Sequence, residues 1–254
     1  MGALAGRVAL VTGGSRGIGR GIALRLGRDG ALVGVHYGSS KEAAEEVVAE
    51  VRAEGGEAFA VRAELGVPGD AAELFGGVDE ELRLRGLEPR LDVLVNNAAT
   101  SGSARIDEVT PELVDRICAV NVKSLVLVVQ EALRRMGEGG RVVNISSAVT
   151  RMAYPESVVY SMSKGAMDTM TLALAKELGP RGITVNAVSP GFIATDMNAK
   201  LRTTEEGAAR LASMSAFGRI GQPADIADVV AFLASGDSRW VTGQLIDGSG
   251  GSGL

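Results

Sequence analysis

Seven runs of mostly apolar residues recur along the chain, and each has the length of a β-strand. They cover residues 7–12, 31–36, 56–62, 91–96, 141–146, 183–189 and 243–248. Strands that are apolar throughout, rather than at every second position, are typical of a parallel sheet covered by helices on both faces. The pattern therefore predicts an α/β protein in which strands and helices alternate.

Several stretches between these runs have helical patterns. Segment 17–30 places Ile18, Ile22 and Leu26 on one helix face. Further helices are predicted over 40–56, 111–136, 155–182 and 224–235. Because no repeat or Pro/Ser-rich linker divides the chain, we expect one domain over residues 1–254. It would be a Rossmann-like, doubly wound parallel sheet of about seven strands with helices on both faces.

Two segments near the C-terminus leave their roles open. Segment 195–216 is polar, weakly patterned and follows a Pro-Gly turn. Insertions of this kind often close over a substrate, so 195–216 is the candidate lid. The alternative is a pair of surface helices without a gating role. The glycine-rich tail SGGSGL at 249–254 could be a flexible end or could reach a neighbouring subunit.

Charge and rare residues exclude several kinds of chemistry. A formal net charge of −5 argues against a general nucleic-acid-binding protein, which needs a basic surface. The single cysteine, Cys118, excludes an internal disulfide and a multi-cysteine metal site. The single histidine, His36, excludes a Ser-His-Asp triad and a two-histidine metal site. We therefore expect no metal, and acid–base chemistry must come from tyrosine, lysine, aspartate or glutamate.

The N-terminal segment lacks a charged region followed by a long apolar stretch, so it has no secretory pattern. No run approaches the ~18 apolar residues that a membrane-spanning helix needs. These observations predict a cytoplasmic protein without membrane contact.

A glycine loop, TGGSRGIG at residues 12–19, joins the first predicted strand to the first helix. Gly13, Gly17 and Gly19 would let the backbone turn tightly and let a pyrophosphate approach the helix N-terminus. The alternative is a tight strand-to-helix turn that binds nothing.

The end of the second strand indicates which dinucleotide fits. Residues 36–41, His-Tyr-Gly-Ser-Ser-Lys, contain no acidic side chain that would bind the ribose 2′-hydroxyl of NAD. Arg16 lies in the glycine loop, and Arg16, Ser39 and Lys41 could together bind a 2′-phosphate. We therefore favour NADP(H). The alternative is that Arg16 and Lys41 are solvated surface residues.

Tyr160 and Lys164 are four residues apart in VYSMSKGA, and this spacing puts both on one helix face. A positive charge near a phenol favours phenolate, so the pair could be an acid–base device. Spacing alone also allows a chance pair.

Together these motifs resemble the classical short-chain dehydrogenase/reductase family over essentially the whole chain. The matching segments follow the family's order. They are TGGSRGIG (12–19), NNAA (96–99), Asn121 in VNVKS, NISS (144–147), YSMSK (160–164) and SPGFIATDM (189–197).

The resemblance implies four catalytic residues: Asn121, Ser147, Tyr160 and Lys164. Tyr160 would be the general acid in reduction and the base in oxidation. Lys164, helped by the positive nicotinamide of the oxidised cofactor, would lower the pKa of Tyr160 from about 10. Ser147 would hydrogen-bond the substrate carbonyl oxygen, and Asn121 would position Lys164 through a water.

The resemblance also implies the residues that bind NADP(H). They are Gly13, Ser15, Arg16, Gly17, Ile18, Gly19, His36, Tyr37, Ser39, Glu64, Leu65, Asn97, Ala98, Ala99, Tyr160, Lys164, Pro190, Gly191, Ile193 and Thr195.

Three features depart from the family pattern. Ala99 stands where glycine is usual, and its Cβ would crowd a turn with positive φ. Glu64 stands where an aspartate beside the adenine is more common. The stretch 81–90 is longer than the family pattern, and we expect it to bulge at the surface.

Within the family, the chain most resembles 3-oxoacyl-carrier-protein reductases and related bacterial ketoreductases. The resemblance lies in residues 35–46, 190–197 and 218–248. It implies an NADP(H)-dependent oxidoreductase that transfers hydride between the nicotinamide and a ketone or secondary alcohol, with a 3-oxoacyl thioester as the expected substrate type. One alternative is a ketoreductase of secondary metabolism acting on a cyclic or polyketide ketone. A non-catalytic, NADP(H)-binding regulatory member is the second alternative.

The expected partners follow from the same resemblance. Substrate walls are expected in 100–106 and 148–158, and Arg105 and Arg151 are candidates to meet an acidic acyl carrier protein. Helices 111–135 and 155–179 are more apolar than one sheet face requires, which fits a dimer. The C-terminal strand and tail could form a second interface and give a homotetramer.

Overall fold

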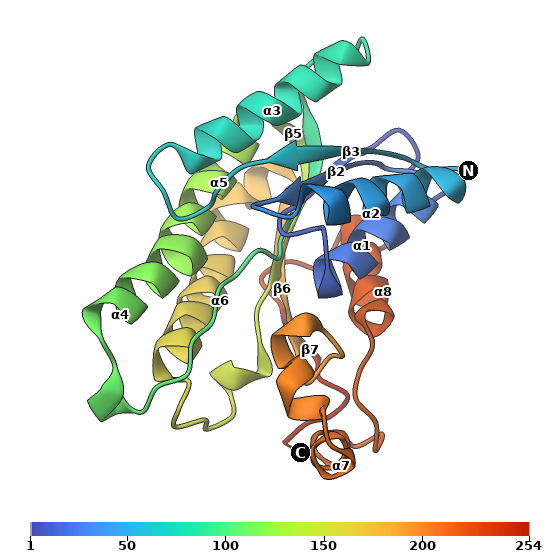
Figure 1. Ribbon diagram of the computed structural model, residues 1–254. Coiled ribbons are helices and arrows are strands. Elements are labelled where there is room, and N and C mark those ends of the chain that lie inside the picture. Colours follow the sequence, from blue (N-terminus) through green and yellow to red (C-terminus); the bar gives the residue numbers. More distant parts are fainter. Residues whose placement is uncertain (1, 254) are drawn as a thin grey trace.

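The computed structural model describes residues 2–253, and a seven-stranded parallel sheet runs through its centre (Figure 1). The strand order is β3-β2-β1-β4-β5-β6-β7. The strands are β1 (Val8–Val11), β2 (Leu32–Tyr37), β3 (Glu57–Arg62), β4 (Leu91–Asn96), β5 (Met136–Ile145), β6 (Thr184–Pro190) and β7 (Leu245–Gly248). The predicted doubly wound parallel sheet is confirmed.

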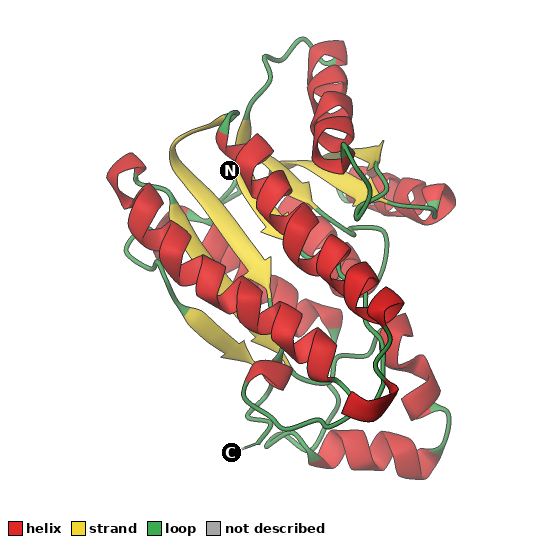
Figure 2. Ribbon diagram, turned by 90° about the vertical axis from the view of Figure 1, so that its left-hand side faces the viewer, coloured by secondary structure: helices red, strands yellow, loops and turns green. Residues whose placement is uncertain are grey.

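Helices cover both faces of this sheet (Figure 2). One layer holds α1 (Gly17–Arg28), α2 (Lys41–Ala53) and α8 (Pro223–Ala234). The other holds α3 (Asp70–Leu84), α5 (Leu125–Leu133) and α6 (Val158–Leu178). Side chains of β1 alternate between the layers: Ala9 and Val11 pack against the first, Val8 and Leu10 against the second. Burial on both faces explains the continuous apolar strands.

The structure around α3 differs from the sequence analysis in two ways. Residues 70–84 form α3, which the sequence analysis did not predict, and residues 81–84 of the expected surface bulge are its last turn. The helix buries Ala71, Leu74, Val78 and Leu82, so its apolar face does follow a helical period.

The predicted helix 111–136 is interrupted. It divides into α4 (Pro111–Cys118), a π-helical segment at Ala119–Ser124 and α5. π-Helical turns inside helices occur frequently at functional sites. Here the segment carries Asn121, whose side chain is buried.

Strand boundaries also shift. β5 begins at Met136, before the predicted start at residue 141, and its pairing with β4 is irregular between Leu91 and Val93. β7 begins at Leu245 because Gly243 has a φ of 68° and turns the chain before the strand. The remaining predicted strands agree within one or two residues.

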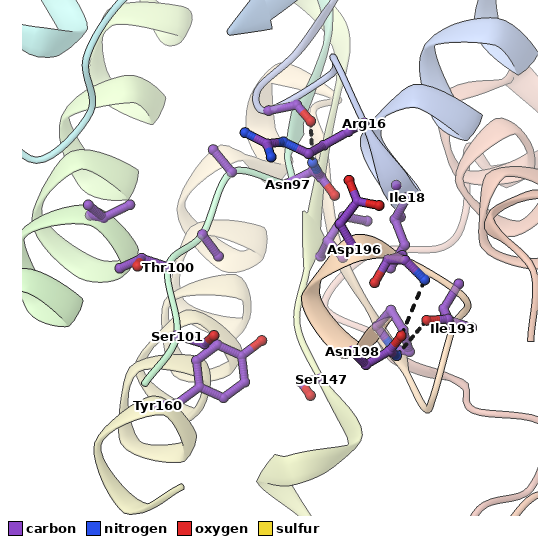
Figure 3. Close-up of a pocket in the computed structure, with 18 of the residues that line it drawn as sticks. Arg16, Ile18, Asn97, Thr100, Ser101, Ser147, Tyr160, Ile193, Asp196 and Asn198 are labelled. Carbon is purple, nitrogen blue, oxygen red and sulfur yellow. Dashed lines mark hydrogen bonds between the residues drawn. The ribbon is translucent and has the colours of Figure 1, made fainter. Parts of the chain in front are cut away.

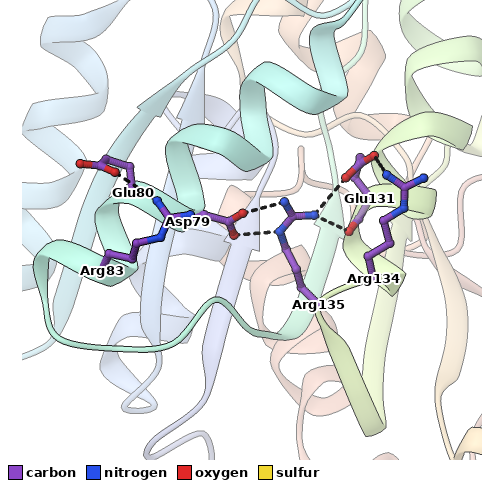
Figure 4. Close-up of polar contacts among 6 residues, drawn as sticks. All are labelled: Asp79, Glu80, Arg83, Glu131, Arg134 and Arg135. Atoms are coloured by element: carbon purple, nitrogen blue, oxygen red, sulfur yellow. Dashed lines mark hydrogen bonds and ion pairs between the residues drawn. The ribbon is translucent and has the colours of Figure 1, made fainter.

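An ion pair fastens α3 to the end of α5 (Figure 4). The Arg135 guanidinium donates to both carboxylate oxygens of Asp79, at 2.8 and 2.6 Å. It also donates to Glu131 at 3.0 Å and lies 4.8 Å from the centre of the Phe75 ring. Hydrogen bonding to Asp79 raises the pKa of Arg135. The pair therefore joins the two helices with fixed, bidentate geometry.

In the part of the chain that the structure describes, no helix is long and apolar enough to cross a membrane. The same residues contain no cluster of His, Cys, Asp and Glu suited to a metal ion.

Candidate active site

A cavity of about 780 Å³ opens at the carboxyl edge of the sheet (Figure 3). Arg16 lies at one end, and Tyr160 and Ser147 lie at the other. Thr100 and Ser101 form one side, and Asp196 and Asn198 the opposite side. The carboxyl edge of a parallel sheet is where ligands of this architecture bind.

The glycine loop forms the first part of this cavity. Gly13 and Gly17 have positive φ angles of 62° and 54°, which other residues rarely adopt. Gly19 lies inside α1 rather than on the cavity lining, and a Cβ there would stand 2.2 Å from the Gly13 carbonyl oxygen. All three glycines are thus required by the backbone path itself.

His36 links the glycine loop to β3. Its Nδ1 accepts a hydrogen bond from the Gly13 amide at 3.0 Å, so Nε2 carries the proton and donates to the Ala63 carbonyl at 3.0 Å. Burial lowers the pKa of His36, with the Ala63 hydrogen bond acting in the opposite direction. The neutral imidazole is therefore a fixed support of the loop.

The segment after β4 is tied to the same loop. The Thr12 hydroxyl accepts from the amides of Asn97 and Ala98 at 2.9 and 3.0 Å. The Asn97 side chain donates to the Thr12 and Gly13 carbonyls at 2.9 and 3.0 Å. Ala99 lines the cavity, and no non-glycine residue among 2–253 has positive φ, so the departure at Ala99 causes no backbone strain.

The end of β2 lies beside Arg16. The Arg16 guanidinium is exposed and approaches the Ser40 hydroxyl at 3.4 Å. Ser39, one of the expected phosphate ligands, does not line the cavity. Glu64 is also absent from the lining, where Ala63 and Leu65 stand instead.

The four residues expected to be catalytic come from three elements. Tyr160 and Lys164 lie on α6, Ser147 lies two residues after the end of β5, and Asn121 lies in the π-helical segment. The Lys164 ammonium lies 5.8 Å from the centre of the Tyr160 ring. Tyr160, Ser147 and Lys164 line the cavity, whereas Asn121 is not part of its lining.

Lys164 is almost fully buried, with 2% of its surface exposed. Its ammonium donates to the Ile145 carbonyl at 2.7 Å. Burial lowers the pKa of Lys164 to about 8, and the charge of Asp168, one helical turn later, opposes this change. One carboxylate oxygen of Asp168 is buried without a hydrogen-bond partner.

The protein's own groups do not produce the predicted lowering of the Tyr160 pKa. Burial raises the pKa of Tyr160, and its hydrogen bond with Ser147 acts in the opposite direction. Burial favours the neutral phenol more than the hydrogen bond with Ser147 favours phenolate. A protonated phenol is the form that can donate a proton.

Asn121 holds the cavity wall. Its side-chain oxygen accepts from the Thr100 amide at 2.8 Å, and its nitrogen donates to the Thr100 carbonyl at 2.8 Å and to Ser163 at 3.0 Å. Arg116 of α4 donates to the Thr100 hydroxyl at 3.0 Å and to the Ser101 carbonyl at 3.3 Å. The wall segment is therefore fixed by backbone and side-chain contacts.

The lid segment (residues 195–216) contains a 3-10 turn at Asp196–Arg202 and helix α7 (Glu205–Ser213). Asn198 donates to the Ile193 carbonyl at 2.7 Å, and Arg202 donates to Asn198 and to the Thr195 carbonyl at 3.0 and 2.9 Å. These contacts fix the base of the segment next to the cavity.

Several lining residues were not named individually from the sequence. They are Gly38, Ala63, Thr100, Ser101, Val120, Ile145, Ser146, Phe192, Asp196, Asn198 and Leu201. Some lie within segments that were expected to face substrate: 100–106 supplies Thr100 and Ser101, and 195–216 supplies three more. Segment 148–158, expected as a second wall, supplies none.

Comparison with known proteins adds an independent line of evidence. The family model described as Enoyl-(Acyl carrier protein) reductase matches residues 13–252. Versicolorin reductase 1 of Aspergillus parasiticus is 42% identical over 260 residues, which cover 98% of this chain and 97% of the relative.

Two solved structures are also similar along their length. The angucycline C-6 ketoreductase LanV with bound NADP is 50% identical, with a TM-score of 0.94 and coverage of 98% of this chain and 96% of the other. The promiscuous reductase LugOII, which catalyses keto-reduction at C1 during lugdunomycin biosynthesis, is 53% identical, with a TM-score of 0.95 and 98% of each chain covered.

Proposed function

The chain belongs to the short-chain dehydrogenase/reductase family, and from this membership we propose that it is an NADP(H)-dependent ketoreductase of secondary metabolism. The observation that carries the proposal is the cavity that joins the glycine loop to Tyr160, Ser147 and Lys164. The expected fold, enzyme class and cofactor agree with relatives that are ketoreductases and with solved structures that contain NADP.

The glycine loop and its surroundings fit a dinucleotide. Gly13 and Gly17 hold positive φ angles, and the absence of a Cβ at Gly19 leaves room for the loop. The exposed Arg16 guanidinium beside Ser40 suits a 2′-phosphate, because residues 36–41 contain no carboxylate to repel it. NADPH, when bound, supplies the hydride.

We propose that Ser147 and Tyr160 act on the carbonyl oxygen. Ser147 would donate a hydrogen bond to that oxygen and hold it beside the Tyr160 phenol. A tyrosine phenol has an ordinary pKa of about 10 and burial raises the pKa of Tyr160 further, so the phenol carries a proton at neutral pH that it can donate as general acid. The Lys164 cation would then stabilise the phenolate, while Asn121 holds the adjoining wall through Thr100.

We propose a ring ketone of an aromatic polyketide, free in solution, as the substrate class. Relatives at 42–53% identity carry the names of versicolorin, angucycline and lugdunomycin reductases. An acidic acyl carrier protein would meet a chain whose own formal charge is −5. Arg151, one expected docking residue, is already paired with Asp247. The 3-oxoacyl thioester expected from the sequence is therefore the second substrate class to test, after the ring ketone.

The test is consumption of NADPH with a panel that includes a polycyclic aromatic ketone, an acetoacetyl thioester and an enoyl thioester. Turnover of the ring ketone supports the proposal, whereas turnover of only a thioester overturns the substrate class. Tyr160→Phe should lower kcat by about 10²–10⁴-fold while NADPH still binds. Tyr154→Phe is the matched control, since Tyr154 does not line the cavity and should retain near-normal turnover.

The cofactor preference has its own test. Arg16→Ala should weaken NADPH binding by about 10–100-fold, the range expected for a charge-assisted hydrogen bond, and should leave NADH binding nearly unchanged. Arg20→Ala removes another exposed arginine, one that pairs with Glu50, and serves as the control. Equal losses for both cofactors would contradict the phosphate assignment.

We further propose a cytoplasmic homotetramer. Exposed apolar side chains stand on α5 and α6, at Val126, Met162 and Leu172, and others stand on α8 and near the C-terminal strand, at Phe232, Trp240 and Leu245. Exposed apolar side chains on these two sets of elements support the proposal of two interfaces between copies. Sedimentation as a monomer at micromolar concentration would contradict the assembly, and fractionation of the source cells would test the location.

Residues 195–216 are proposed as a lid over the cavity. Closure of this lid should slow the exchange of bound substrate with the solvent.

A further inference from the structure

The glycine-rich tail folds back onto its own chain. Ser249 and Ser252 are only 6% and 2% exposed. The Ser252 amide donates to the Ser249 hydroxyl at 3.0 Å, and the Ser252 hydroxyl donates to the Ser249 carbonyl at 2.9 Å. Gly250, Gly251 and Gly253 have positive φ angles and form a compact turn. Residues 249–253, the C-terminal brace, are therefore ordered, and the flexible end expected as one alternative is wrong for them.

One side of the brace holds the loop that follows Ser147. The Arg151 guanidinium contacts the Asp247 carboxylate at 2.5 Å and donates to the Ser249 hydroxyl at 2.8 Å. Although burial would raise it, hydrogen bonds from Ser249 and Arg151 hold the pKa of Asp247 below its usual range. Arg151 lies only four residues after Ser147, so this contact restrains the loop on which the serine depends.

The other side of the brace holds the end of the lid segment. The Gly250 carbonyl accepts from the Ala216 amide at 2.9 Å and from the Ser215 hydroxyl at 3.2 Å. A Cβ at Gly250 would also stand 3.3 Å from the Phe217 ring. The lid segment is thus attached to the brace at its C-terminal end.

The brace also touches the cavity lining directly. Gly191 lines the cavity, and a Cβ at Gly191 would stand 2.9 Å from the Ser249 carbonyl oxygen. Asp247 pairs in register with Ser189, two residues before Gly191. The brace therefore contacts three segments around the cavity: the loop after Ser147, the turn at Gly191 and the end of the lid segment.

We propose that the C-terminal brace positions the substrate side of the active site and that Arg151 is its positioning residue. The brace fixes the loop after Ser147 relative to the lid segment, so that Ser147 and Tyr160 meet one carbonyl oxygen. This role rests on the proposed ketoreductase function. Of the residues expected to bind NADP(H), Gly191 lies against the brace at Ser249. The glycine loop, which would hold the pyrophosphate, receives its support from His36 and Asn97 instead.

The test compares the full-length protein with Arg151→Met and with a chain truncated after Gly248. Both variants should lose at least ~10-fold in kcat/KM for the ketone. In Arg151→Met, which leaves Ser249 beside Gly191, the Kd for NADPH should change by less than ~2-fold. The truncated chain that also carries Arg151→Met should lose no more kcat/KM than the more impaired of the two single variants, because both changes remove the same support. Arg151→Lys should restore part of the activity. Arg83→Met, which removes an exposed pair with Glu80, is the control and should match the wild type.

Hydrogen exchange of the lid segment separates this proposal from the proposed function. Both variants should exchange amides of residues 205–216 at least ~5-fold faster than the wild type, whether or not any ketone in the panel is a substrate. Unchanged exchange together with unchanged kcat/KM would overturn the brace. Parallel loss of NADPH binding and ketone turnover would also overturn it, since that result indicates general loss of the fold. Faster lid exchange in an enzyme without ketone turnover would support the brace and contradict the ketoreductase assignment.

Discussion

The buried charge of Lys164 should make the stability of the protein depend on pH in a way that one substitution removes. Burial lowers the pKa of Lys164 from 10.5 to about 8. Between these values the unfolded chain binds more protons than the folded chain, so the free energy of unfolding rises with pH. Below pH 8 the folded protein carries the full cost of the desolvated charge. At about 1.4 kcal/mol for each pKa unit, that cost is about 3 kcal/mol at pH 7.

Lys164→Met should therefore stabilise the fold more at pH 7 than at pH 9.5. From the two pKa values, the cost falls from about 3 kcal/mol at pH 7 to about 1 kcal/mol at pH 9.5. The difference in unfolding free energy between the variant and the wild type should thus shrink by about 2 kcal/mol over this range. The bond to the Ile145 carbonyl is lost at both pH values and cancels in the comparison.

The assay is urea unfolding of both proteins at pH 7 and pH 9.5, at one protein concentration, followed by circular dichroism. Lys176→Met is the matched control, because Lys176 lies on the same helix but is exposed. A change of less than ~0.5 kcal/mol between the two pH values for Lys164→Met would refute the reasoning, since it would mean that Lys164 keeps its ordinary proton affinity. The same variant should lose ketone turnover, so that stability and activity change in opposite directions.

Three further predictions, one of them with a matched control, test other parts of the structure. Gly19→Ala should weaken NADPH binding by at least ~30-fold, because its Cβ would collide with a glycine-loop carbonyl, whereas Gly76→Ala has open space in α3 and should stabilise the helix by about 0.5–1 kcal/mol. Arg135→Met should destabilise the fold by about 2–4 kcal/mol in urea unfolding, since it leaves Asp79 buried without its partner. His36→Phe should cost about 2–4 kcal/mol and weaken NADPH binding, measured by titration, because two buried backbone groups lose their partner.

Much of the fold follows from local patterns in the sequence. The central strands are continuous apolar runs because helices cover both faces, and that burial makes them easy to find. The start of β5 does not show this pattern, since residues 136–140 include glycines and a glutamate and pair irregularly with β4. The missed helix α3 did have an apolar helical period, so there the signal was present in the sequence.

The candidate site could be predicted only as far as its motifs reach. The glycine loop, Ser147, Tyr160 and Lys164 line one cavity, as their motifs suggested. Contacts with backbone atoms were invisible in the sequence, as the bonds between Asn121 and Thr100 show. Those bonds accompany a π-helical turn inside what looked like one continuous helix.

The direction of the Tyr160 pKa shows a second limit. A sequence reveals that Lys164 is near Tyr160, but it does not reveal how completely each side chain is removed from water. Burial raises the pKa of Tyr160 and lowers that of Lys164, so both effects favour the neutral forms. The outcome depends on tertiary packing rather than on the spacing of the two residues.

The strand order has a consequence for synthesis on the ribosome. β1 is among the first segments made, yet one of its edges pairs with β4, which begins about 80 residues after β1 ends. At about 5–20 residues per second, that edge waits about 4–16 seconds for its native partner. During this interval the nascent chain presents an apolar strand with free backbone groups, which is a template for incorrect pairing. Substitutions that slow the formation of β4 should therefore reduce the yield of soluble protein while leaving the activity of the folded molecules unchanged.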